Sequence, residues 1–104
     1  MSLYYNIVGS TSSSVELIAP RVSQSIKSIL LTNVHATQEA TVTLFIEDNP
    51  SSGSSNKYYV LHTVGIPADA ALFLDDKSML KFESKYGLYV EVGSSDTVDV
   101  MINT

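Results

Sequence analysis

The two histidines, His35 and His62, are the side chains of this sequence best suited to bind a transition metal or to act as a general base. They lie far apart in the chain, and the sequence contains no cysteine to complete a ligand set. A zinc site uses three or four ligands, usually with short local spacings. The sequence therefore predicts no metal site and no cofactor, with His35 in a surface turn and His62 in a partly buried strand.

Carboxylates and hydroxyls do not form a catalytic pattern either. Asp75 and Asp76 are adjacent, with Asp69 upstream, but neighbouring residues on a strand face opposite sides and would not share one ion. No serine lies in a G-x-S-x-G motif, and neither the dinucleotide-binding nor the phosphate-binding glycine pattern occurs. We expect no catalytic and no cofactor-binding residues, and predict that the chain is not an enzyme.

The aromatic side chains are the remaining candidates, and they are all tyrosine or phenylalanine. Exposed tyrosines can anchor a protein interface or stack on sugar rings. Tyr4 and Tyr5 lie near the start of the chain, whereas Phe45 and Tyr89 fall on the less apolar side of two predicted strands. Tyr4 and Tyr5 are predicted interface residues, and two interpretations stay open for Phe45 and Tyr89. They form a second contact surface, or another strand or loop of the same chain covers them.

The elements that must position these side chains are strands, because apolar and polar residues alternate with a period of two. The pattern is clearest in residues 40–48, where Val42 and Leu44 point one way and Thr43 and Phe45 the other. The expected strands cover residues 3–8, 15–19, 25–33, 40–48, 58–64, 71–75, 79–83, 88–92 and 98–102. Residues 25–33 alternate less cleanly, which indicates a bulge or burial on both faces. No segment predicts a helix of useful length.

Two connections carry turn signals. Residues 93–96 are short and polar, so we expect the last two strands to form an antiparallel hairpin. Residues 49–56 are rich in serine and asparagine, and they predict a surface loop between two strands. Seven to nine short strands in 104 residues indicate a single all-β domain spanning residues 1–104. The predicted fold is an antiparallel β-sandwich, either Ig-like or jelly-roll-like.

Charge and composition exclude several classes of partner. The net charge is −5 and only 16% of the residues are charged, so neither nucleic acid nor an anionic membrane is an expected partner. No apolar run approaches the roughly 20 residues that span a bilayer, and the first residues lack the pattern of a signal peptide. We expect the protein to be made and used without membrane export.

Three stretches together resemble a known group of proteins. A strand ending at Asn33 leads to A-T-V-T-L from Ala40, residues 58–74 contain Y-V-L, I-P and L-F-L in that order, and residues 86–102 complete the pattern. This order is similar to small β-sandwich virion proteins of tailed bacteriophages, especially cyanophages and other marine phages. Many of those proteins carry G-D before the penultimate strand, whereas residues 83–87 here read E-S-K-Y-G.

The resemblance implies a non-enzymatic virion structural protein, made in the host cytoplasm and located in the virion. Its first expectation is a capsid decoration (cement) protein that binds the major capsid protein, and its alternative is a neck or tail component. The expected partners are other virion proteins, with the chain itself a homo-oligomer or part of an array. A carbohydrate-binding module working through exposed tyrosines is the alternative from another class, although the sequence contains no tryptophan, the commonest sugar-stacking residue.

Overall fold

The computed structural model describes residues 2–10, 14–22, 25–48, 56–76, 78 and 80–104. These residues form strands and connections and contain no helix, so the predicted all-β sandwich is confirmed. The eight strands are β1 (Ser2–Val8), β2 (Val15–Ile18), β3 (Ser28–Asn33), β4 (Ala40–Glu47), β5 (Lys57–Ile66), β6 (Ala71–Leu74), β7 (Gly87–Val92) and β8 (Thr97–Asn103).

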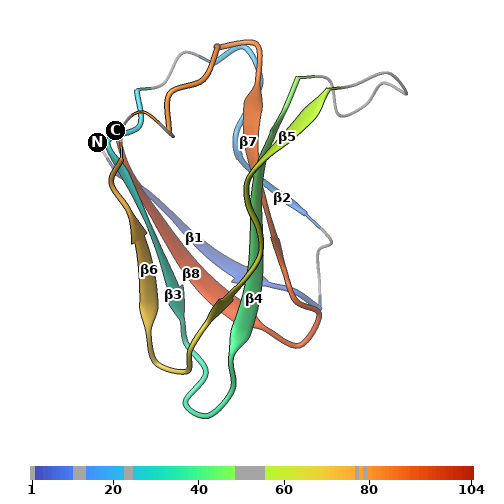
Figure 1. The fold of residues 1–104 in the computed structure, drawn as a ribbon, viewed down its shortest axis with the longest axis vertical. Coiled ribbons are helices and arrows are strands. Elements are labelled where there is room, and N and C mark those ends of the chain that lie inside the picture. The colour runs from blue at the N-terminus through green and yellow to red at the C-terminus, as the bar shows by residue number, and fades with distance from the viewer. Residues whose placement is uncertain (1, 11–13, 23–24, 49–55, 77, 79) are drawn as a thin grey trace.

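The strands form two four-stranded sheets in which every neighbouring pair is antiparallel. Sheet A has the order β1-β8-β3-β6 and sheet B the order β2-β7-β4-β5 (Figure 1). Every connection except that from β4 to β5 therefore carries the chain from one sheet to the other. This is the strand order of an eight-stranded jelly roll, and it differs from the sheets of an Ig domain. Of the two predicted sandwich types, the jelly-roll-like one is present.

The predicted hairpin between the last two strands is wrong. Both strands exist, as β7 and β8, but they lie in different sheets. β7 pairs with β2 and β4, and β8 pairs with β1 and β3, so each is an inner strand of its sheet. The turn between them crosses from sheet B to sheet A because both apolar strands are buried more completely as central strands than as a pair at one edge.

The strand predicted at residues 79–83 is also wrong for its described part. Residues 80–83 form no strand and belong to the connection from β6 to β7. Leu80 accounts for the apolar signal, since its side chain packs into the core from this connection. Residue 79 and most of the predicted surface loop, residues 49–55, lie outside the described residues.

One core lies between the two sheets. Val42, Leu44, Val90 and Val100 lie in it, and all four are fully buried. They come from β4, β7 and β8, and strand alternation turns each of them inward. The predicted pattern of β4 is therefore confirmed. In β3 the pairing to both neighbours is continuous, so its apolar run does not mark a bulge.

The edge strand β5 departs from regular pairing with β4. Val42 lies opposite Val64 and Leu44 opposite Leu61, so two residues of β5 face Thr43 alone. Thr63 takes up the extra length with a φ of 49°, and its N–H donates to Oγ1 of Thr43 at 3.0 Å. A bulge of this kind twists an edge strand and hinders pairing with another sheet.

A buried asparagine holds one end of the sandwich together. Asn33, at the end of β3, is 1% exposed. Its amide donates to the carbonyls of Gln38 at 2.8 Å and Ile66 at 3.0 Å, and its Oδ1 accepts the N–H of His35 at 2.9 Å. These bonds join the β3–β4 turn to the end of β5. The Asn33 amide therefore connects β3 of sheet A to the segment before β4 and to the end of β5 in sheet B.

We expect Asn33→Ala to lower the free energy of unfolding by about 2–4 kcal/mol, because it leaves buried carbonyls and an N–H without a partner. Thr37→Ala, at an exposed position of the same turn, is the control and should change stability by less than about 0.5 kcal/mol. Urea denaturation followed by circular dichroism measures both. Equal stability of the two variants would contradict this role of the amide.

Candidate functional site

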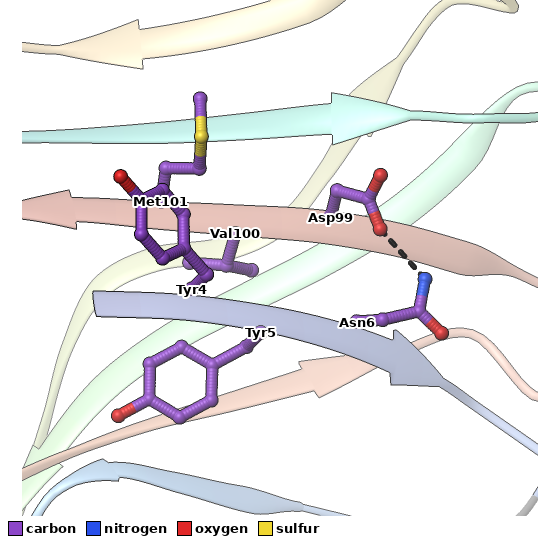
Figure 2. Close-up of a pocket in the computed structure, with 6 residues that line it drawn as sticks. All are labelled: Tyr4, Tyr5, Asn6, Asp99, Val100 and Met101. Atoms are coloured by element: carbon purple, nitrogen blue, oxygen red, sulfur yellow. Dashed lines mark hydrogen bonds between the residues drawn. The ribbon is translucent and has the colours of Figure 1, made fainter. Parts of the chain in front are cut away.

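The outer face of sheet A exposes three large apolar side chains, Tyr4, Phe73 and Met101. Alternation in β1 turns Tyr4 and Asn6 outward, and alternation in β8 does the same for Asp99 and Met101. Their sequence neighbours in β8, Val100 and Ile102, enter the core. Figure 2 shows the Tyr4 ring and the Met101 side chain together on one side of the two strands.

Four of these outward side chains form a continuous line across the sheet. Tyr4 pairs with Met101, Met101 with Leu30, and Leu30 with Phe73, so the line crosses all four strands. We call it the apolar row. Tyr4 is 71%, Met101 38% and Phe73 55% exposed, and Leu30 is half-buried between its neighbours. Three strand spacings of about 4.8 Å make the row roughly 14 Å long.

Polar side chains flank the apolar row on both sides. On one side the Asn6 amide donates to Oδ1 of Asp99 at 2.6 Å, and Thr32 continues this flank on β3. On the other side the Asn103 amide donates to Oγ of Ser28 at 2.9 Å. An apolar centre with a hydrogen-bonded polar margin is the composition of a protein-contact surface.

A shallow hollow of about 310 Å³ opens on this face beside Tyr4. Its lining residues are Tyr4, Tyr5, Asn6, Asp99, Val100 and Met101 (Figure 2). The one carboxylate in the lining already accepts a hydrogen bond from the Asn6 amide. The hollow offers apolar contact and ring stacking, and its lining contains no nucleophile paired with a base.

Tyr5 was predicted as a contact residue together with Tyr4, but the two side chains leave β1 in opposite directions (Figure 2). The Tyr5 hydroxyl donates to the backbone carbonyl of Leu17 in β2. β1 and β2 are edge strands of different sheets, so this bond closes one side of the sandwich. Burial, and secondarily the charge of Glu16, raise the pKa of Tyr5. Tyr4 alone of this pair is open to a partner.

Phe45 and Tyr89 lie on the outer face of sheet B, as their alternation predicted, but the chain itself covers them. Phe45 is 2% and Tyr89 6% exposed. The two rings stack with centroids 5.5 Å apart, and Tyr59 meets Phe45 edge-on at 6.0 Å. Nζ of Lys57 lies 4.0 Å from the centre of the Phe45 ring. Of the two open interpretations, coverage by the same chain describes this pair, and side chains of β5 provide it.

Tyr89 is also held by a carboxylate. Its hydroxyl donates to Oε2 of Glu16 at 3.2 Å. Burial, followed by the charge and the hydrogen bond of Glu16 and the charge of Glu47, raises the pKa of Tyr89 to about 12. Phe45 and Tyr89 thus cannot contact a partner unless the aromatic and charged side chains around them move away.

Other exposed apolar residues were not singled out from the sequence. Leu30, Phe73 and Met101 complete the apolar row, and Tyr58 and Tyr59 on β5 are 56% and 51% exposed. A signal for Leu30 was present in the unbroken run Ile29-Leu30-Leu31, since alternation must turn one member outward. Their alignment with Tyr4 depends on which strands pair, and no local pattern contains that information.

The histidines and acidic residues have local roles. His35 Nε2 donates to the carbonyl of Ser95 at 3.0 Å, and the His62 ring packs 4.6 Å from the Tyr59 ring. Asp76 accepts the N–H and the hydroxyl of Ser78. Among the described residues, no three histidine, aspartate or glutamate side chains are grouped closely enough to hold a metal ion.

Comparison with models of known protein families finds no match, and comparison with curated protein sequences finds none. In the part of the chain that the structure describes, no helix is long and apolar enough to cross a membrane.

The raised pKa of Tyr89 predicts a loss of stability at high pH. The ordinary pKa of tyrosine is about 10, so between pH 10 and about 12 the unfolded chain loses this proton before the folded one does. The contribution of Tyr89 is complete below pH 10 and disappears as the pH rises to about 12. Tyr89→Phe should therefore lose less stability than the parent chain between pH 9 and 11, measured by urea denaturation at each pH. An identical loss in both would contradict the prediction.

Proposed function

We propose that this chain is a non-enzymatic structural protein of a tailed-bacteriophage virion, in the first place a capsid decoration protein that binds the major capsid protein. A neck or tail protein of the same particle is the alternative within this class. The observation that carries the proposal is the apolar row, which crosses all four strands of sheet A and leaves Tyr4, Met101 and Phe73 exposed. Contiguous exposed apolar surface of this kind marks a contact with another macromolecule.

The fold supports the proposal by analogy. Eight-stranded jelly rolls occur in viral capsid domains, and they also occur in lectins and in small-molecule-binding proteins. Fold alone does not determine function. The resemblance to phage virion proteins that residues 25–102 predict points to the same class of protein.

The two sheet faces support an assembly role from another direction. On sheet B, Lys57 and Tyr59 cover the ring of Phe45, which stacks on Tyr89. On sheet A, three of the four outward side chains of the apolar row stay more than one-third exposed. A partner that covers the apolar row would stabilise the complex, because burying apolar surface contributes roughly 25 cal/mol per Å².

Carbohydrate binding is a second candidate because β5 exposes two adjacent tyrosines. Tyr59 packs against His62 at 4.6 Å, and Tyr58 meets Tyr86 edge-on at 5.9 Å. An exposed ring with polar neighbours can stack on a sugar. Glycan-array binding that Tyr59→Ala removes and Phe73→Ala retains would favour this function over assembly.

The test of the virion role is incorporation into particles. We expect mass spectrometry to find the chain in purified virions of the phage that encodes it. Phe73→Asp should lower its copy number on the particle about tenfold or more, because a carboxylate in an apolar contact costs at least the roughly 1.4 kcal/mol of a tenfold change. Circular dichroism checks that the variant folds, as expected for a residue 55% exposed.

His62→Asp is the matched control, since it adds the same charge at an exposed position on the edge strand of the other sheet. It should leave incorporation unchanged. Absence of the parent chain from intact virions would overturn the proposal. Equal incorporation of both variants would show that the apolar row is not the contact that attaches the chain to the particle.

A further inference from the structure

We infer that the apolar row is a self-complementary contact and that its occupant is the same face of a second copy of this chain. The inference deepens the proposed function, on which it rests in treating the row as an assembly contact. Two observations support it, the distribution of charge and the order of the strands, and the area of the face sets the strength of the contact.

Charge favours a second copy at this face. The chain carries a net charge of −5, from 11 acidic and 6 basic residues, so two copies repel each other through most of their surfaces. The outward residues described on the strands of sheet A include one ionised side chain, Asp99. Its carboxylate accepts the Asn6 amide at 2.6 Å, and it lies beside the apolar row instead of within it. This face is where a second acidic chain can approach at the lowest electrostatic cost.

Strand order makes the row complementary to itself. A two-fold axis that runs parallel to the strands and between the two copies reverses the order β1-β8-β3-β6. β1 then lies over β6 of the second copy and β8 over β3, while the apolar row remains over the apolar row. Tyr4 faces Phe73 of the partner subunit, and Met101 faces Leu30 of the partner subunit.

The flanking polar side chains fit the same arrangement. Asp99 on β8 faces Thr32 of the partner subunit on β3, so each carboxylate meets a hydroxyl that can donate to it and does not meet the other carboxylate. A two-fold axis along the row would place each of the four side chains directly against its own copy. We place the axis parallel to the strands because it sets unlike side chains against each other and each Asp99 carboxylate against a hydroxyl.

The area of the face sets the strength of this contact. Four strands about 4.8 Å apart, with up to seven residues of about 3.3 Å each, give roughly 400 Å² of flat surface per copy. Specific interfaces bury about 800 Å² per partner. The pair is therefore weak in dilute solution, and it becomes stable where a surface holds many copies at high local concentration.

Site-directed cross-linking tests the contact. The sequence has no cysteine, so an introduced cysteine is the only thiol that can react. Tyr4→Cys and Phe73→Cys are prepared as two separate proteins of different tag length. Packed sheets lie about 10 Å apart, so a short bismaleimide spans the two positions whereas a disulfide does not. The inference predicts that mixing the two proteins gives a mixed dimer at least about tenfold more abundant than the dimer each forms alone.

Met101→Asp in both proteins should remove the mixed dimer, and His62→Asp in both should retain it. Cross-linking of each variant with itself as strongly as with the other would overturn the arrangement. Monomers alone at millimolar concentration, by sedimentation and cross-linking, would overturn the inference.

The two proposals fail separately. If no dimer forms while Phe73→Asp still lowers incorporation into virions, the row binds a different virion protein and the function stands without the self-contact. If the dimer forms as described while the chain is absent from virions, the self-contact stands and the virion role fails.

Discussion

The inward position of the Asn33 side chain is the constraint on which the rest of the molecule depends. Its amide and carbonyl groups bond the β3–β4 turn and the end of β5 from a position that is 1% exposed. A strand has a period of two, so fixing Asn33 inward also fixes Leu31 inward and Leu30 outward. A slip of one residue would place Leu30 in the core and turn Leu31 and Asn33 outward, so the buried hydrogen bonds of Asn33 would be lost. The hydrogen bonds of one side chain thereby determine which surface the chain presents.

The same end of the sandwich explains why local sequence could not predict strand pairing. Residues 93–96 have the length and polarity of a hairpin turn, yet they connect different sheets. Oδ2 of Asp96 accepts the N–H of Thr41 at 3.0 Å, which attaches this turn to the start of β4. A Cβ at Gly93 would lie 2.2 Å from that carboxylate, so the glycine permits the close approach. The residue types of this segment predicted the turn correctly. The strands that it connects depend on its bond to Thr41, which lies far away in the sequence.

Most of the strands were predictable because each buries one face, and a strand that buries one face alternates apolar and polar residues in its sequence. The candidate site was predictable in part. Alternation placed Phe45 and Tyr89 on outer faces, but it does not report what covers an outer face. Phe45 is covered by Lys57 and Tyr59 from β5, whose irregular register with β4 no local pattern shows. Phe73 stays exposed because β6 is an edge strand of only four residues, and no further strand pairs with it to contribute a covering side chain.

This difference between the faces connects stability to assembly. On sheet B an aromatic stack, a lysine and the Glu16–Tyr89 hydrogen bond keep Phe45 and Tyr89 buried. On sheet A the chain keeps the apolar row exposed within a nearly uncharged face. The net charge of −5, carried almost entirely outside this face, makes free copies repel each other. In the proposed assembly, the contact between two apolar rows is weak and the rest of the surface is repulsive, so the chains would not associate at low concentration. They would associate only where a particle surface holds the copies in the orientation that brings one apolar row onto another.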